Sequence, residues 1–293
     1  MTTLINPFGP FNPALAAAMA ANIEAALAED VGSGDLTGKL VPENEIVKAQ
    51  VVVREDAVLC GAPWFEGVMK HLDAGIRIHW HYAEGAAMQA DTVVCTIDAP
   101  ARALLTAERA ALNFLQLLSA VATATSRYAK AVHGTRASVL DTRKTLPGLR
   151  LAQKYAVIVG GGKNQRLALY DGILIKENHI AAAGGITAAL HAAQALDAGV
   201  SIQIEVENLR QLAEALDAGA TSVLLDNFNL DAMRAAVALN DGRALLEASG
   251  GINMDSVRTI AETGVDRISI GSLTKDIRAT DYSLRIVTID PER

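Results

Sequence analysis

The feature that most constrains the fold is a repeating alternation that begins after Thr135. Short apolar runs, typical of buried strands, alternate with amphipathic helical segments at a period of roughly 20 to 35 residues. Consecutive strands joined by helices make right-handed connections, so the strands lie parallel in one sheet that helices cover. The pattern therefore predicts an α/β barrel that is closed or nearly closed.

Six such runs can be identified, and each ends in polar residues. They lie at residues 139–144, 173–176, 202–205, 223–227, 245–249 and 268–272. A full barrel has eight strands, so the sequence leaves open whether the barrel is incomplete or weaker strands are hidden. Several intervening helices end at Gly199, Gly219 or Gly264, and glycine is the usual residue just past a helix.

The N-terminal part predicts a separate, smaller domain. Expected helices and strands here are a helix at 14–28, strands at 49–57, 76–81 and 92–98, a helix at 64–71, and a long helix at 102–132. We expect an N-terminal helix (1–30) packed on an α/β sandwich (31–120), a barrel domain (121–280) and a C-terminal segment (281–293) that returns to the sandwich.

Composition restricts the classes of function. A net charge of -7 and a pI near 5.4 argue against non-specific nucleic-acid binding, which needs a broad basic face. Cys60 and Cys95 form no Cys-x-x-Cys pair, so neither a disulfide framework nor a thiolate metal site is expected. We expect a cytoplasmic location, where cysteines stay reduced. No apolar run has the length of a membrane span, and the Ala-rich start lacks the basic residues of a secretion signal.

The carboxyl ends of the strands are where an α/β barrel places its active site. Those ends carry Arg143, Lys144, Lys176, Glu205, Asp226, Ser249 and Gly271. A single polar residue at a strand end can serve solubility alone, but a whole set is harder to explain in that way.

Basic residues are concentrated between Arg143 and Lys176, where seven lysines and arginines meet one acid, Asp171. A solvated helix face accounts for Lys154, but it explains residues that directly follow apolar strands poorly. A focused positive cleft suits a substrate that carries several carboxylates or phosphates. The sequence therefore predicts a local site for anions in an acidic protein.

Two acids and two glycine turns complete the predicted site. Glu205 and Asp226 could hold Mg²⁺ on a pyrophosphate-bearing substrate or stabilise positive charge on a sugar, although either could instead form an ion pair with Lys176 or Arg143. The turns at 249–252 and 271–274 follow strands and open predicted helices, where backbone N–H groups can bind phosphate. Glycine is common in any tight turn, so each turn alone is a weak signal.

These motifs resemble those of the quinolinate phosphoribosyltransferases. The matching blocks are Asp-Thr-Arg-Lys-Thr-Leu-Pro-Gly-Leu-Arg (141–150), Lys-Tyr-Ala-Val (154–157), Gly-Gly-Gly (160–162) and the segments 108–113, 174–180, 205–207, 225–227 and 247–252. The resemblance runs from Glu29 nearly to the end. It implies a type II phosphoribosyltransferase fold, an N-terminal α/β sandwich plus an incomplete α/β barrel, in a homodimer or hexamer whose sites are shared between subunits.

The resemblance also implies an activity and its residues. The activity is transfer of phosphoribosyl from phosphoribosyl pyrophosphate to quinolinate with decarboxylation, giving nicotinate mononucleotide, CO₂ and pyrophosphate for NAD biosynthesis. The implied substrate-binding residues are Arg109, Thr142, Arg143, Lys144, Arg166, Lys176, Glu205, Asp226, Ser249, Gly250, Gly251, Ile270, Gly271 and Ser272. Of these, Lys144, Lys176, Glu205 and Asp226 are implied to be catalytic, and the two acids to hold Mg²⁺ directly or through water. The residues alone make Arg109 a helix-surface residue, and its reach into a neighbouring subunit comes only from the resemblance.

One position departs from the family pattern. Gln165 stands between Asn164 and Arg166, where the family usually has histidine. Glutamine can donate a hydrogen bond to a carboxylate but cannot be protonated. Either the histidine is dispensable, or Lys163 substitutes for it, or activity is reduced.

Two other functions remain open at this stage. Lys176 at a strand end could be the Schiff-base lysine of an aldolase barrel. Alternatively, the chain could be an inactive nucleotide-binding regulator, for which Gln165 is the only support.

Overall fold

The computed structural model describes residues 5–6, 12–42 and 45–287, which form two compact units. The first unit comprises Met1–Ala124, Leu146–Gly160 and Asp276–Arg293, and the second comprises Thr125–Thr145 and Gly161–Lys275. This division differs from the expected domains chiefly at 146–160, a helical segment that we expected in the barrel domain. The packing of that segment, described below, explains the difference.

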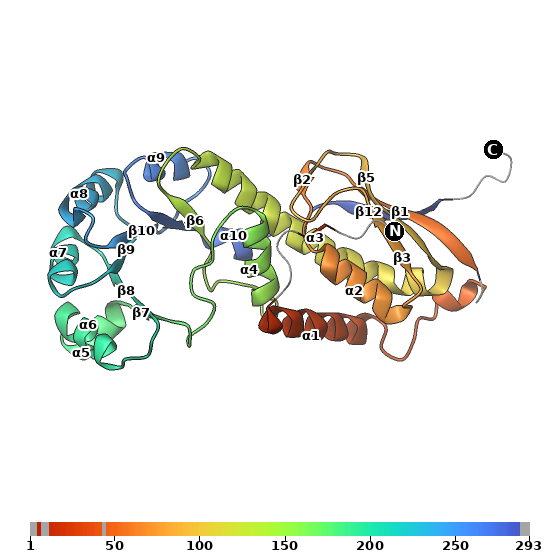
Figure 1. Ribbon diagram of the computed structural model, residues 1–293, viewed down its shortest axis with the longest axis horizontal. Helices are drawn as coiled ribbons and strands as arrows, with labels where there is room; N and C mark the ends of the chain where they lie inside the picture. Colours follow the sequence, from red (N-terminus) through yellow and green to blue (C-terminus); the bar gives the residue numbers. More distant parts are fainter. Residues whose placement is uncertain (1–4, 7–11, 43–44, 288–293) are drawn as a thin grey trace. The chain divides into compact units, whose positions relative to one another are not determined.

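The first unit is an α/β sandwich. Its antiparallel sheet has the order β12 (Tyr282–Val287), β1 (Ile46–Val53), β5 (Thr92–Pro100), β3 (Arg77–Trp80), and β2 (Ala57–Val58) pairs with β4 (Ala87–Met88) (Figure 1). Its helices are α1 (Pro13–Asp30), α2 (Ala62–Leu72), α4 (Arg150–Val159) and most of α3 (Ala101–Ala131), with a short 3₁₀ turn at Gly38–Leu40.

Two details of this unit differ from the sequence expectations. The single strand expected at 49–57 is wrong, because the chain turns after Val53 and Ala57 begins a separate short strand. Strand β12 was not recognised as a strand, although its pairing with β1 returns the chain to the sandwich sheet. The last part of the expected C-terminal segment, 288–293, lies outside the described residues.

The core of the sandwich follows from the alternation along β1. Ala49, Val51 and Val53 are fully buried on one face of the strand, as a two-residue period requires. The same core contains Trp64 and Phe65 of α2, also fully buried. At about 25 cal/mol per Å² of apolar surface, side chains of this size stabilise the unit by roughly 2 kcal/mol each or more.

Helix α4 joins this core through its own aromatic residue. The ring of Tyr155 lies 5.4 Å from that of Trp64, and the Tyr155 hydroxyl donates a hydrogen bond to Glu84 Oε1 at 3.0 Å. At the start of the same segment, Asn22 Nδ2 donates to the carbonyl of Gly148 at 3.1 Å. These contacts give the physical reason why 146–160 belongs to the sandwich unit.

Glu84 is a buried carboxyl that organises this junction. It accepts the backbone N–H of Gly61 at 2.8 Å and of Ala62 at 3.2 Å, two of the donors at the amino end of α2. Burial raises the pKa of Glu84 to about 7, although the hydrogen bonds from Gly61, Tyr155 and Ala62 act in the opposite direction.

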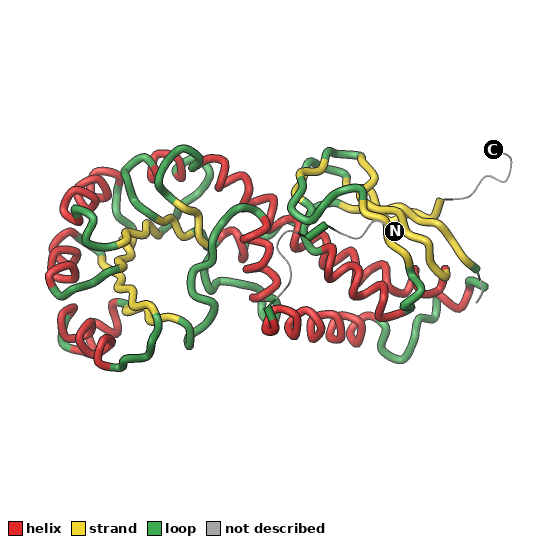
Figure 2. The backbone as a smooth tube through the Cα atoms, in the orientation of Figure 1, coloured by secondary structure: helices red, strands yellow, loops and turns green. Residues whose placement is uncertain are grey.

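The second unit is an incomplete α/β barrel. Its six parallel strands have the order β6 (Ser138–Leu140), β11 (Arg267–Ser269), β10 (Leu245–Ser249), β9 (Ser222–Asp226), β8 (Ser201–Val206), β7 (Gly172–Ile175). Helices lie outside the strands (Figures 1 and 2). They are α5 (Glu177–Ala183), α6 (Ile186–Ala195), α7 (Leu209–Asp217), α8 (Leu230–Asn240) and α9 (Val257–Ala261), and α10 (Ser272–Lys275) follows β11. The expected fold class is confirmed, and the six described strands are the six found in the sequence.

Each barrel strand has an outer and an inner face. On β9, Val223 and Leu225 are fully buried beneath the helices, whereas Ser222, Leu224 and Asp226 occupy the alternate positions that face the barrel interior. The parallel registers pair Leu245 with Ser222 and extend this arrangement from strand to strand. The interior is therefore built of successive rows of side chains.

The cysteines and the helix lengths bear on what the sequence led us to expect about disulfides and membrane spans. Cys60 and Cys95 are both buried, and no disulfide joins them. Across the described ranges, no helix combines the length and the apolar character needed to span a bilayer.

The raised pKa of Glu84 predicts a pH dependence of stability. Between about pH 4.5 and 7 the folded state keeps a proton on Glu84 that the unfolded state loses, so the free energy of unfolding falls as pH rises, by roughly 3 kcal/mol over the window. We expect Glu84→Gln to remove this part of the slope, because the amide does not titrate.

Urea unfolding at pH 5 and pH 8 measures the effect. Both tryptophans of the chain, Trp64 and Trp80, belong to the sandwich unit, so their fluorescence reports its unfolding. The other titrating groups are common to the two proteins and cancel in the comparison. Equal pH slopes for the variant and the parent protein would contradict the assignment.

Candidate active site

The polar strand ends predicted from sequence come together at the carboxyl edge of the barrel. Glu205 of β8 pairs in register with Leu224, and Asp226 of β9 pairs with Ser249 of β10. The residues of this inner carboxyl-end row are Thr142, Lys176, Glu205, Asp226, Ser249 and Gly271. The prediction that Glu205 and Asp226 end neighbouring strands is confirmed.

An ion pair links two members of this row. Lys176 Nζ lies 3.1 Å from Glu205 Oε2, and the Glu205 side chain is 11% exposed whereas that of Lys176 is 46% exposed. The ion pair considered from sequence is therefore present. Because it leaves the ammonium group accessible, it orients Lys176 without closing it off from an anionic ligand.

The loop after β6 is tied to the glycine turn after β11. The hydroxyl of Thr142 accepts the backbone N–H of Lys144 at 3.0 Å, and the Thr274 hydroxyl donates to the carbonyl of Lys144 at 2.8 Å. A Cβ on Gly271 would lie 3.2 Å from Lys144 Cδ and 3.6 Å from Thr142 Oγ1. Glycine at 271 therefore leaves the space through which the Lys144 side chain passes.

The turn after β10 holds the second acid in place. Asn227 Nδ2 donates to Asp226 Oδ2 at 3.0 Å, and the backbone N–H of Asn227 donates to the carbonyl of Ser249 at 3.0 Å. Gly250 has a φ of +108°, and a Cβ there would lie 2.1 Å from Asn227 Oδ1. The helix that we expected to open at this turn begins only at Val257, because residues 252–256 form irregular turns first.

Arg143 and Arg166 form a cationic pair. Burial, and next the positive charge of Arg143, lower the pKa of the Arg166 guanidinium. Arg166 Nη1 donates to the carbonyl of Gly172 at 3.1 Å, which fixes the side chain beside the start of β7. Two neighbouring guanidinium groups are suited to a ligand with two carboxylates.

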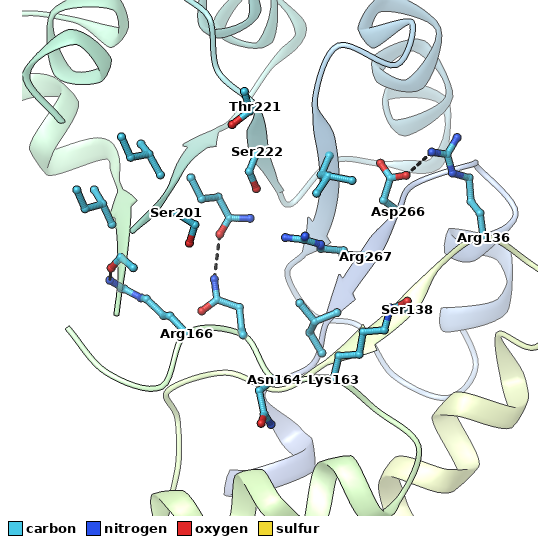
Figure 3. A pocket seen from close by; sticks show the side chains of 17 residues that line it. Arg136, Ser138, Lys163, Asn164, Arg166, Ser201, Thr221, Ser222, Asp266 and Arg267 are labelled. Atoms are coloured by element: carbon cyan, nitrogen blue, oxygen red, sulfur yellow. Dashed lines mark hydrogen bonds and ion pairs between the residues drawn. The ribbon is translucent and has the colours of Figure 1, made fainter. Parts of the chain in front are cut away.

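A cavity of about 620 Å³ lies at the opposite, amino-terminal ends of the barrel strands. Its lining includes Ser138, Gly172, Ser201 and Ser222, the small first inner residues of four strands, together with Arg166 (Figure 3). The carboxyl-end acids and Lys176 do not line it. Of the predicted site residues, Arg166 lines this cavity. Lys176, Glu205 and Asp226 lie instead at the carboxyl edge.

The carboxyl edge offers few protein ligands for a magnesium ion. The hard oxygens of Glu205 and Asp226 are suitable ligands, but within the described ranges no three His, Cys, Asp or Glu side chains form a group that could hold a metal. The donor set therefore fits a cation that takes most of its ligands from substrate phosphates and water.

Arg109 is an exposed residue of α3 in the sandwich unit. Its exposure agrees with the expectation from the residues alone. Its implied role in a neighbouring subunit stays a prediction.

Sequence reasoning overlooked several residues that shape the site. Asn227 and Thr274 hold Asp226 and Lys144, and Gln203 and Glu247 lie buried in the inner row below the carboxyl edge. A signal for the last two was available, because a polar residue at every second position of a buried strand, as in Ser-Ile-Gln-Ile-Glu at 201–205, marks a polar inner face.

Comparison with known proteins agrees with this geometry. A family model described as the quinolinate phosphoribosyl transferase N-terminal domain matches residues 35–119, and the corresponding C-terminal domain model matches residues 121–285. The chain belongs to the quinolinate phosphoribosyltransferase family.

Individual members of the family are similar over nearly their whole length. A probable nicotinate-nucleotide pyrophosphorylase (carboxylating) of Bacillus subtilis is 39% identical, over 88% of this chain and 90% of that protein. Its counterpart in Mycobacterium leprae is 42% identical over 89% of this chain and 95% of that protein. The nicotinate-nucleotide pyrophosphorylase structure of Francisella tularensis aligns with a TM-score of 0.91 at 40% identity, over 98% of this chain and all of that one.

The turn at Gly250 gives a testable requirement for glycine. Gly250→Ala should destabilise the barrel unit by about 2 kcal/mol or more, because a Cβ meets Asn227 and the φ of +108° is strained for alanine. Gly251→Ala is the matched control, since its φ is +58° and nothing lies within 4 Å, so about 1 kcal/mol is expected. Thermal melts compare the two variants, and equal losses would show that the contact with Asn227 does not matter.

Proposed function

We propose that the protein transfers the phosphoribosyl group of phosphoribosyl pyrophosphate to quinolinate and releases CO₂ and pyrophosphate, giving nicotinate mononucleotide. Membership of the family supports this activity, and the B. subtilis and M. leprae relatives carry the corresponding name. The observation that carries the proposal is the carboxyl edge, where Lys176, Glu205 and Asp226 meet on neighbouring strands.

Binding of quinolinate is assigned to the cationic side chains. Arg143 would pair with one carboxylate, and Arg166, whose pKa the charge of Arg143 lowers, would have to turn from the Gly172 carbonyl to pair with the other. Lys144 and Lys176 would contribute further positive charge from the carboxyl edge. Bidentate guanidinium contacts would fix the plane of the ring and so aim its nitrogen at the sugar.

Binding of phosphoribosyl pyrophosphate is assigned to the acids and the glycine turns. Glu205 and Asp226 would face the ribose and, directly or through water, Mg²⁺, which when bound supplies positive charge to the departing pyrophosphate. The turns at 249–251 and 270–272 would receive the 5′-phosphate on their backbone N–H groups. Gly250 and Gly251 adopt positive φ, a conformation that favours glycine. Because glycine has no side chain, nothing on these two residues would block a phosphate.

The chemistry then needs little acid–base catalysis. The ring nitrogen attacks the anomeric carbon as the bond to pyrophosphate breaks, and the carboxylates of Glu205 and Asp226 stabilise the positive charge on the sugar. The nitrogen becomes cationic, and this charge stabilises the carbanion left when the adjacent carboxylate departs as CO₂. A proton from solvent then completes the product.

The ion pair weighs against the aldolase alternative. A Schiff-base lysine must present its amine to a carbonyl carbon, whereas Lys176 Nζ is held 3.1 Å from Glu205 Oε2 in an ion pair. The inactive-regulator alternative is distinguished by turnover. We also propose a cytoplasmic location, for which the two unpaired, buried cysteines are the support.

The direct test is a turnover assay on the purified protein with quinolinate, phosphoribosyl pyrophosphate and Mg²⁺. Nicotinate mononucleotide and CO₂ should form, and nicotinate, which lacks the second carboxylate, should not be used. Lys176→Met should lower kcat/KM by about a hundredfold or more, because it removes a charge that acts on the transition state. Lys48→Met, which changes an exposed ion pair with Asp98, is the matched control and should be fully active. Use of nicotinate at a similar rate would overturn the assignment of the carboxylate contacts.

A site shared between subunits is a further proposal, supported by the exposure of Arg109. Arg109→Ala and Lys176→Met should each be inactive alone. If Arg109 acts in the neighbouring subunit's site, mixing the two variants under conditions that allow subunit exchange should restore about a quarter of the parent activity, since half the dimers are mixed and each holds one intact site. A mixture that stays inactive although exchange is demonstrated would exclude sharing.

A further inference from the structure

The cavity at the amino-terminal ends of the barrel strands lies apart from the carboxyl edge, and the proposed function assigns no substrate to it. Its volume of about 620 Å³ falls within the range of roughly 300 to 1,000 Å³ that is usual for small-molecule sites. An α/β barrel normally fills its interior with layers of bulky side chains. An open space at one end of this barrel therefore needs a physical reason.

Small residues at the starts of four strands create this space. Ser138, Gly172, Ser201 and Ser222 begin β6, β7, β8 and β9, and all four line the cavity. Leu245 of β10 pairs in register with Ser222 and lines the same cavity, so a large apolar side chain is compatible with this row. Strand geometry alone therefore does not impose the small residues.

The three serines offer hydroxyl groups that the rest of the described chain does not use. Across the described ranges, the hydroxyls of Ser138, Ser201 and Ser222 form no hydrogen bond with another protein group. Each hydroxyl can donate one hydrogen bond and accept two. Because they come from three different strands, they can contact one bound molecule from several sides.

Cationic side chains outnumber acids around the cavity. Among the described residues that line it, one is an acid, Asp266, and four are cationic: Arg136, Lys163, Arg166 and Arg267. Both oxygens of Asp266 are already used, because Oδ1 pairs with Arg136 and Oδ2 accepts the backbone N–H of Leu246 at 2.9 Å. The cavity thus favours an anion, although the whole chain has a net charge of -7.

Arg267 directs an available cation into this space. It begins β11 in register with Ser138, and Figure 3 shows its guanidinium extending among the side chains that line the cavity. Within the described part of the chain, neither Arg267 nor Lys163 forms an ion pair or a hydrogen bond through its side chain. Burial raises the pKa of Glu247, and the charge of Arg267 acts against that shift, but Glu247 is 1% exposed and does not line the cavity. The N–H donors of Arg267 are therefore available to a ligand.

We propose that this cavity is a second anion-binding site, which takes the phosphate of a phosphorylated sugar on Arg267 and Lys163 and its hydroxyl groups on the serines. A phosphate monoester presents three acceptor oxygens, so it can use a bidentate guanidinium and a lysine together. The volume suits an organic molecule rather than a single ion. The site is independent of the proposed function, because no substrate of that reaction is assigned to it.

Calorimetric titration of the full chain with ribose 5-phosphate tests the site. Arg267→Met should weaken one binding site per chain at least tenfold, because it removes a charge-assisted, bidentate contact. Arg234→Met is the matched control, since it removes an exposed arginine of the same unit that pairs with Asp231 on α8. This control should bind ribose 5-phosphate as the parent protein does.

Filling the cavity gives an independent variant that keeps every charge. Ser222→Leu places a large apolar side chain beside Leu245, so the same site for ribose 5-phosphate should be lost although all four cations remain. Thermal melts check that both variants are folded.

Three comparison ligands identify the chemistry of the site in the parent protein. Inorganic phosphate lacks the sugar, ribose lacks the charge, and succinate replaces the phosphate with carboxylates. Each should bind in the cavity at least tenfold more weakly than ribose 5-phosphate. A comparison ligand that binds there equally tightly would overturn the proposed ligand class.

Hydrogen exchange locates the bound ligand and separates this site from the carboxyl edge. Ribose 5-phosphate should slow exchange at the strand starts 138–140 and 201–203 in the parent protein, but not in Arg267→Met. Two sites in the parent, of which both variants lose one, support the cavity site beside a 5′-phosphate site at the carboxyl edge. A single site that both variants lose supports the cavity alone and counts against that second assignment.

The cavity site fails if the parent protein binds no ribose 5-phosphate. It fails equally if either folded variant, Arg267→Met or Ser222→Leu, matches the parent in the number and affinity of its sites. Neither result depends on whether the parent makes nicotinate mononucleotide, so the turnover assay tests the proposed function separately.

Discussion

The parallel register of the barrel strands is the constraint on which the site depends. Side chains alternate strictly between the two faces of a strand, so a shift of one residue would turn the whole inner row outward under the helices. With the observed pairing of Glu205 to Leu224 and of Asp226 to Ser249, acids and glycine turn meet at one edge. The apolar residues between them, such as Val223 and Leu225, fix that register by burying against the helices.

The inner rows divide the barrel into layers of different character. Small residues begin four of the strands beside a cavity, leucines and hydrogen-bonded polar residues occupy the middle, and Lys176, Glu205 and Asp226 lie at the carboxyl ends. In the middle, Gln165 donates a hydrogen bond to Gln203 and Gln203 donates one to Glu247, so that the carboxyl-end site rests on polar contacts as well as on leucines. A protein with a net charge of -7 can in this way still gather cationic side chains locally in its barrel.

Helix α4 packs against residues of the sandwich unit. Tyr155 and Glu84 join this helix to α2, although the chain on both sides of α4 belongs to the barrel unit. The segments 141–145 and 163–166 flank it, and they carry Arg143, Lys144 and Arg166. The buried hydrogen bonds of Glu84 thus fix the middle of a stretch whose two ends supply cationic residues.

The sequence by itself determined the alternation of strands and helices, the six barrel strands, and the charged residues at the strand ends, because a two-residue period and a helical period are local properties of the chain. Only the tertiary structure decided that Lys176 pairs with Glu205, that Asn227 occupies the space above Gly250, and that α4 packs in the sandwich. It also decided that hydrogen bonds join Gln165, Gln203 and Glu247. These residues come from different strands and loops, and their contacts depend on how far each strand is staggered against the next. Stagger is set by packing across the whole barrel and leaves no local signal in the sequence.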